Sequence, residues 1–211
     1  MTTIQTPEYR FRSQRLVYRS PEDSDSDKAF YQHQILNDPT IQSMSSLRLK
    51  GPVAKKSAEE MINIMQEKTL LGVVICLPHP EQSPGQDSKP KPIPIGQLAL
   101  FNMGMGPSHH HRHATLGISL VDGYRGKGYG GEAINWILDW AFMHAGLHRV
   151  GLDAFSFNEN GLKLYRKLGF VEEGRQREVI RHLRGWHDVI KFSMLEDEWE
   201  KLRGFGQEQK E

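Results

Sequence analysis

The sequence lacks the features of several protein classes. It has one cysteine, Cys76, so it can form neither an intrachain disulfide nor a zinc site built from several cysteines. No stretch approaches the ~18 apolar residues of a membrane span. The N-terminal residues contain no apolar segment of the secretory type. We therefore expect an intracellular protein, cytoplasmic or nuclear, with no membrane partner.

The sequence also lacks a strong charge of either sign. It carries 27 Lys and Arg residues against 26 Asp and Glu residues, a formal net charge of +1. Such a chain has no global field that attracts nucleic acid. We therefore expect no nucleic-acid partner, and any anionic ligand must be bound by a local arrangement of groups.

The apolar pattern predicts one α/β domain over residues 10–200, with loose termini at 1–9 and 201–211. Residues 79–94 are rich in Pro and Ser and interrupt two strand patterns, which indicates a long exposed loop. The order β-α-α-β-β-β-α-β-α-β-β requires a mixed sheet. Strands are predicted near 15–19, 71–77, 95–101, 114–121, 149–155, 170–183 and 187–195, and helices near 24–36, 57–68, 128–144 and 159–167.

The turn between the strand at 114–121 and the following helix carries the clearest chemistry. Its sequence over residues 125–130 is RGKGYG. Glycine lets backbone N–H groups approach a ligand closely, and the N-terminus of a helix favours a phosphate. Arg125 and Lys127 add positive charge. The turn therefore predicts a site for a pyrophosphate.

A competing interpretation is a dinucleotide fingerprint, because Gly126-x-Gly128-x-x-Gly131 matches its spacing and Asp153 follows near the end of the next strand. That fingerprint normally opens a βαβαβ unit, whereas here about 120 residues precede it. The sequence thus leaves a nicotinamide-dependent oxidoreductase as a minor alternative.

A second motif separates these alternatives. Residues 158–170, NENGLKLYRKLGF, resemble the second signature of the GNAT acetyltransferase superfamily, and Arg125-x-x-Gly128-x-Gly130 resembles the first. Residues 15–19 and the closing segment 185–199 are similar to the ribosomal-protein and polyamine acetyltransferase branch. The resemblance implies the GNAT fold, a single domain whose mixed, splayed central sheet is flanked by helices, with acetyl-CoA as co-substrate.

The resemblance also implies roles for particular residues. The strand before the turn would bind the pantetheine arm, the turn would hold the pyrophosphate, and Tyr165 would donate a proton to the departing thiolate. Gly161 departs from the family, which usually has Ala there. The implied catalytic residue is Tyr165, no metal ligand is implied, and the implied cofactor-binding residues are Ile118, Leu120, Val121, Arg125, Gly126, Lys127, Gly128, Tyr129, Gly130 and Asn158.

The general base is not visible in the sequence. Many relatives carry a Glu near the position of Thr115, but residues 114–121 contain no carboxylate or His. Asp153, Glu172 and His113 remain candidates. Without a base, the free energy of deprotonating the acceptor at pH 7 adds ~4.6 kcal/mol to the barrier for a lysine-like amine and ~1 kcal/mol for an α-amine. This difference favours a small-molecule α-amine or a protein N-terminus as acceptor.

Other features stay open. The histidines over residues 109–113 have no fixed ligand geometry, so a solvated loop is favoured over a metal site. The acidic run that begins at Glu196 is interpreted as a solvated face. A non-catalytic acyl-CoA-binding module is the main alternative to an enzyme, and both a monomer and a homodimer are compatible with the sequence.

Overall fold

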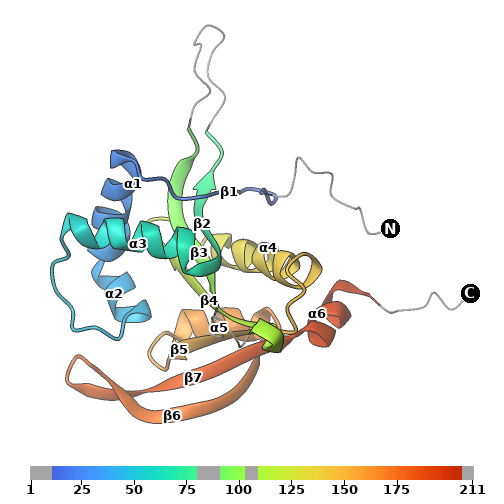
Figure 1. Cartoon of the computed structure of the whole chain (residues 1–211). Helices are drawn as coiled ribbons and strands as arrows, with labels where there is room; N and C mark the ends of the chain where they lie inside the picture. The colour runs from blue at the N-terminus through green and yellow to red at the C-terminus, as the bar shows by residue number, and fades with distance from the viewer. Residues whose placement is uncertain (1–10, 80–90, 103–108, 206–211) are drawn as a thin grey trace, which may run out of the picture.

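A computed structural model describes residues 11–79, 91–102 and 109–205 (Figure 1). The predicted loose N-terminus 1–9 and most of the predicted loop 79–94 lie outside these ranges. The elements are β1 (Val17–Arg19), α1 (Asp25–Ala29), the π-helical η2 (Phe30–Leu36), α2 (Pro39–Ser45), α3 (Lys55–Glu67), β2 (Thr69–Leu77), β3 (Ile93–Phe101), the 3-10 turn η3 (His109–His111), β4 (His113–Leu120), α4 (Tyr129–Met143), β5 (Arg149–Phe155), α5 (Glu159–Lys167), β6 (Val171–His182), β7 (Gly185–Leu195) and α6 (Glu196–Arg203).

The strands of the described ranges form one mixed sheet in the order β1-β2-β3-β4-β5-β7-β6. Neighbours pair in antiparallel fashion except β4 and β5, which are parallel. This confirms the predicted mixed sheet. It excludes the nicotinamide alternative, because a dinucleotide fold requires a succession of parallel strands.

The parallel pair at the centre of the sheet is short. Residues 113–115 of β4 pair with residues 149–151 of β5. Beyond them β4 continues to Leu120 and β5 to Phe155 without pairing with each other. One edge of β4 therefore stays open to a ligand over residues 116–120, while its other edge is paired with β3.

Helices cover both faces of the sheet (Figure 1). One face packs against α4 through buried side chains such as Ile134 and Ile137, and partly buried residues of α5 join this cluster. The opposite face packs against η2 and α3 through Tyr31, Ile35 and Ile62. α4 follows β4 after a short turn, and Gly130 in its first turn lies close to Leu120, so the N-terminus of α4 lies beside the open edge of β4.

The structure corrects several predicted boundaries. The helix predicted at 57–68 runs from Lys55 to Glu67, and β3 begins at Ile93 within the predicted loop. A helix that was not predicted, α2, occupies Pro39–Ser45, with the Asp38 side chain accepting from Ile41 N at 2.8 Å. This is a regular N-cap, with Pro at the first helical position.

The predicted loose C-terminus begins too early, and the acidic run at Glu196 is a helix. α6 extends to Arg203 because Trp199 is buried against α4. The Trp199 indole N–H and the Arg203 Nε both donate to Asp139 Oδ1 at 2.8 Å. The segment after β7 is therefore docked on the domain.

No helix in the described part of the chain is both long enough and apolar enough to cross a membrane.

Candidate active site

The glycine-rich turn joins the open edge of β4 to the N-terminus of α4. Gly126 and Gly128 have φ values of +73° and +85°, which side-chain-bearing residues rarely adopt. Gly128 is the N-cap of α4, and residues 126–128 are exposed. The first N–H groups of a helix have no partner within the helix, so this exposed turn lies at the positive end of α4. The geometry suits an anionic group.

Arg15 packs against this turn, although it is more than a hundred positions away in sequence. Its guanidinium donates to the Lys127 carbonyl at 3.0 Å, forms an ion pair with Glu132 at 2.8 Å and lies 4.6 Å from the Tyr129 ring centroid. A Cβ on Gly128 would lie 3.1 Å from Arg15 Nη2. Sequence reasoning placed Arg15 in a strand and missed this contact.

Arg125 is less available than predicted. Its Nε donates to the Leu120 carbonyl at 2.8 Å, and its Nη2 donates to Asp38 at 2.7 Å. The side chain therefore ties the end of β4 to the start of α2, and its charge is already paired. Its backbone still forms part of the turn.

The side chains of β4 alternate between the two faces of the sheet. Ile118 and Leu120 lie on the α4 and α5 side, whereas Val121 packs against the opposite cluster and its N–H donates to the Ile95 carbonyl. A Cβ on Gly130 would lie 3.5 Å from Leu164 and 3.6 Å from Leu120. β4, α4 and α5 therefore meet at Gly130.

Asn158 caps α5, and Gly161 lies against that cap. The Asn158 side-chain oxygen accepts from Gly161 N at 3.0 Å. A Cβ on Gly161 would lie 2.6 Å from Asn158 Nδ2. The departure from the family's Ala thus lies beside a predicted cofactor-binding side chain, whose amide end would have to shift if a Cβ were added.

Tyr165 follows Leu164 on α5 and packs against the sheet. Its ring centroid lies 5.9 Å from that of Phe192 and 6.1 Å from that of Phe170. Burial raises the pKa of Tyr165, so the phenol keeps its proton at pH 7. The helix contact at Gly130 brings this region of α5 to the side of β4 that carries Ile118 and Leu120.

The three candidate general bases differ in their ion pairing and in their charge state. Glu172 is paired with Arg166 at 2.8 Å on the α5 side, and exposed Asp153 is paired with Lys191 at 3.4 Å. His113 begins β4 on the same face as Thr115. Burial and the charge of Arg149 lower the pKa of His113, so this ring is neutral at pH 7.

A groove of about 740 Å³ lies between α2, residues 50–52 and the tip of the β6–β7 hairpin. At one end Asn37 and Pro39 flank Asp38, which pairs with Arg125. On its other bank His182 stacks on Phe157, two residues beyond β5. The groove therefore adjoins the ends of both splayed strands, on the side of α2.

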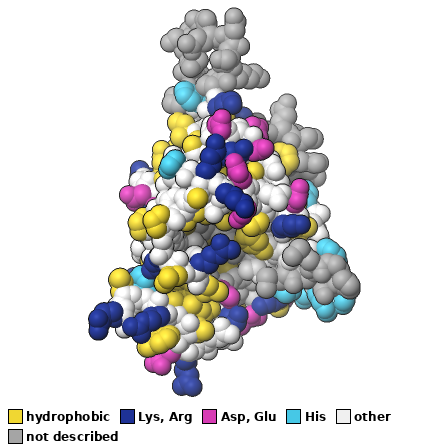
Figure 2. Space-filling model, turned by 60° about the vertical axis from the view of Figure 1, so that its left-hand side comes forward, with side chains coloured by type: hydrophobic (Ala, Val, Ile, Leu, Met, Phe, Trp, Pro, Cys, Tyr) yellow, Lys and Arg dark blue, Asp and Glu magenta, His cyan; other side chains and the backbone are white. Residues whose placement is uncertain are grey.

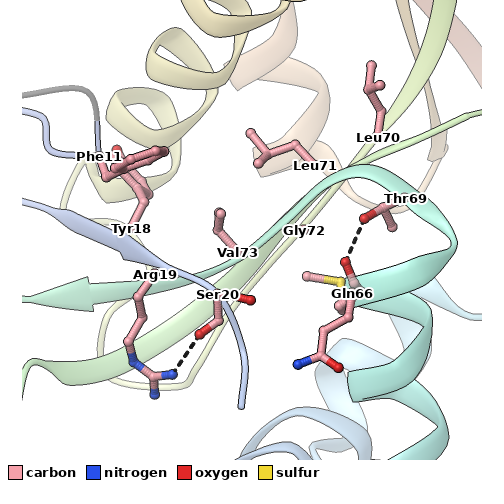
Figure 3. A pocket seen from close by; sticks show the side chains of 11 residues that line it. Phe11, Tyr18, Arg19, Ser20, Gln66, Thr69, Leu70, Leu71, Gly72 and Val73 are labelled. Carbon is pink, nitrogen blue, oxygen red and sulfur yellow. Dashed lines mark hydrogen bonds between the residues drawn. The ribbon is translucent and has the colours of Figure 1, made fainter. Parts of the chain in front are cut away.

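A second pocket, of about 440 Å³, lies at the far edge of the sheet (Figure 3). Figure 3 shows Phe11 against Tyr18 at one side and Leu70 and Leu71 at the other. Arg19, its charged lining residue, is paired with buried Asp27. Because β1 and β2 are separated from β5 by β3 and β4, this pocket is remote from the open edge.

The histidine-rich segment forms an exposed 3-10 turn over His109–His111, followed by β4. Within the described ranges, no group of three or more His, Cys, Asp and Glu side chains is arranged to hold a metal ion.

Comparison with known proteins places this arrangement in a family. The family described as acetyltransferase (GNAT) domain matches residues 15–171, so the chain belongs to the GNAT acetyltransferases. It is 33% identical over 112 residues to a prophage-derived N-acetyltransferase of Bacillus subtilis, covering 52% of this chain and 60% of the relative. It is 30% identical over 105 residues to a putative ribosomal N-acetyltransferase of that organism, covering 50% and 55%.

A spermidine N(1)-acetyltransferase of Vibrio cholerae is 32% identical over 105 residues, covering 50% of this chain and 58% of the relative. The chain thus spans between half and two thirds of the length of these curated relatives. A solved spermidine N-acetyltransferase from Vibrio cholerae, in complex with CoA and spermine, superposes with a TM-score of 0.69 at 24% identity, over 89% of this chain and 99% of that one. This likeness confirms the predicted GNAT fold.

Proposed function

We propose that this protein transfers an acetyl group from acetyl-CoA directly to a primary amine. The observation that carries the proposal is the open edge of β4, which leads into the exposed glycine-rich N-terminus of α4. An extended pantetheine arm can add to such an edge as a strand does, and the helix N-terminus can hold the pyrophosphate. GNAT acetyltransferases use acetyl-CoA in this way.

The residues around the edge fit this ligand. The backbone of residues 125–130 would hold the pyrophosphate, with Lys127 supplying charge. Ile118 and Leu120 would pack beside the pantetheine arm. Asn158 would contact it through its amide N–H₂, because its oxygen is engaged by the cap of α5.

The proposal assigns few chemical steps to the chain itself. Acetyl-CoA supplies the activated acyl group, and the acceptor nitrogen forms a bond to its carbonyl carbon as the carbon–sulfur bond breaks. A backbone N–H of β4 would stabilise the developing oxyanion. Tyr165 would donate its phenolic proton to the departing thiolate, and the proton lost by the amine would pass to solvent or to a base such as His113.

The groove beside α2 favours an α-amine over a polyamine. Its lining residues include Lys50 and His182 and no carboxylate. Asp38, the single carboxylate between residues 37 and 58, is paired with Arg125. A polyamine would normally be met by unpaired carboxylates. We therefore expect α-amino compounds to exceed spermidine in kcat/KM at about pH 7.5.

Two measurements test the proposal. Isothermal titration should detect acetyl-CoA binding and no NAD(P)H binding. Thiol release from acetyl-CoA should then accelerate with amines from a panel of amino acids, peptides and polyamines. Binding without turnover on any amine would instead identify a non-catalytic acyl-CoA-binding module, and spermidine as the best acceptor would refute the preference for α-amines.

A further inference from the structure

The two banks of the groove beside α2 are bridged by a polar contact. Lys50 Nζ lies 2.7 Å from His182 Nδ1. A Lys ammonium can only donate, so His182 accepts through Nδ1 and is neutral. Partial burial, Lys50 and His187 all lower the pKa of His182, in agreement with this state at pH 7. The partner of Lys50 at the mouth of the groove is therefore a neutral ring and not a carboxylate.

The hairpin tip on the second bank has an unusual backbone. Leu183 and Arg184 connect β6 to β7 with φ values of +45° and +68°. Tight hairpins that need such angles normally use Asn and Gly, because larger side chains are strained there. Leu183 is nevertheless 86% exposed and lines the groove. The tip thus keeps a large apolar side chain and a cation at a cost in conformational energy.

The same rim carries unpaired positive charge on both sides of the groove. Within the described residues, its cations form no ion pair with a carboxylate, whereas most other Arg side chains of the sheet do, such as Arg149 with Glu173. Over residues 174–187 the sole carboxylate is Glu178. Figure 2 shows Lys and Arg side chains gathered around and below the hollow on this face, with few acidic ones. The unpaired cations at the groove are Lys50, in its lining, and Arg184, at the hairpin tip next to the lining residue Leu183.

Apolar side chains are also exposed close to these cations along the chain. Leu183 lines the groove and is exposed, and Leu47 and Leu49, which precede Lys50 in the sequence, are 79% and 100% exposed. Exposed apolar groups beside unpaired charges are typical of a surface that binds another chain. A free amino acid would present one carboxylate and occupy one end of the groove, whereas the cations lie on both banks.

We propose that the acceptor is the N-terminus of a peptide or protein whose following residues carry carboxylates. The α-amine would enter at the end of the groove near Asn37, and acidic side chains farther along would lie against the cations of the rim. This inference rests on the proposed acetyltransferase activity and names its substrate class.

The test uses three hexapeptides with the same first two residues, Ser and Ala. The remaining four positions carry two Glu residues, two Gln residues or two Lys residues at identical places, with Gly between them. Thiol release is followed at about 50 mM and 300 mM salt. We expect kcat/KM to be about tenfold higher for the Glu peptide than for the Gln peptide at low salt, and the difference to shrink at high salt because exposed pairs are screened.

Reversing the charge of two rim residues tests whether these residues cause the preference for the Glu peptide. The double variant Lys50→Glu/Arg184→Glu should prefer the Glu peptide over the Gln peptide by less than about twofold, and should gain activity on the Lys peptide. The control is Lys68→Glu, on an exposed residue at the end of α3 away from the groove, which should keep the wild-type preference. Unchanged acetyl-CoA affinity shows that each variant is folded.

The outcomes are distinct. Equal rates on the three peptides, or a preference for the Lys peptide, would overturn the inference and leave the acetyltransferase standing. Peptides that are all inactive while a free amino acid or a polyamine is acetylated would do the same. A preference that survives in the double variant would place the anion site elsewhere and also refute the inference. Acetyl-CoA binding without turnover on any amine would refute the proposed function itself.

Discussion

At the scale of single residues, Gly128 is constrained both by its backbone and by its neighbour Arg15. Its φ of +85° disfavours any side chain, and a Cβ would lie 3.1 Å from Arg15 Nη2. We predict that Gly128→Glu abolishes detectable acetyl-CoA binding, because a carboxylate would occupy the place expected for the pyrophosphate. Isothermal titration measures the effect.

Gly146 offers a matched control for this substitution. It has a φ of +61°, has open space around its Cα and follows the opposite end of α4, about 20 Å away. Gly146→Glu therefore imposes similar strain and the same charge. Acetyl-CoA affinity within about threefold of wild type is expected for Gly146→Glu, and the same result for Gly128→Glu would refute the assigned turn.

Tyr165 makes a second prediction at this scale. Loss of one general acid typically lowers a rate by roughly 10²- to 10⁴-fold. We expect Tyr165→Phe to lower kcat by this order while the dissociation constant of acetyl-CoA changes little, since the ring contacts with Phe170 and Phe192 persist. Single-turnover thiol release and titration separate the two. An unchanged rate would make Tyr165 a packing residue.

At residue scale the sequence predicted the glycines of the turn, but not the partners of its charged side chains. Arg15 reaches the turn through contacts with Lys127 and Glu132 that no local pattern signals. Arg125 could be recognised as part of the motif, yet its pairing with Asp38 depends on a helix that was not predicted. The direction of a side chain depends on tertiary contacts, so the spacing of residues in the sequence could not predict it.

At the scale of elements, long segments with strong periodicity were predicted well and short ones were missed. α4 and α5 begin within a residue or so of their expected positions. α2 has one buried residue, Ile41, which is too little for an apolar stripe. Asp38 followed by Pro39 was nevertheless a readable start signal.

α6 was missed although its charges follow the helix dipole, with acidic residues in the first turn and basic residues in the last. Its docking makes a prediction. Trp199→Ala removes a buried indole and its hydrogen bond to Asp139, so we expect a loss of about 3–5 kcal/mol in the free energy of unfolding. Urea denaturation measures it. Leu202→Ala, on an exposed side chain of the same helix, serves as control and should cost much less.

At the scale of the whole molecule, Glu132 fastens the N-terminal segment to the domain. Its oxygens accept from Ser13 Oγ at 2.7 Å and from Arg15 N at 2.6 Å. Burial alone would raise the pKa of Glu132, but these hydrogen bonds and the charge of Arg15 lower it overall. The ionised side chain therefore stabilises the folded state.

This shift gives a pH prediction. Because the folded-state pKa is lowered, the stabilisation is fully present above the ordinary Glu pKa of about 4.3 and is lost as pH falls through the lower folded value. Wild type should exceed Glu132→Gln in stability at pH 7 and 5.5, and the gap should close towards pH 3. Denaturation midpoints at these pH values check the trend. A gap that widens in acid would contradict it.

The short contact between β4 and β5 has a consequence for the cooperativity of folding. Three residue pairs join the half-sheet β1–β4 to the half-sheet β5–β7–β6. Backbone hydrogen bonds between the halves are few, so their coupling depends largely on α4 and α5, which pack across both. A ligand that pairs with β4 along its open edge would extend this contact. Substrate binding would then also join two subdomains into one cooperative unit, as slower amide exchange in both halves would reveal.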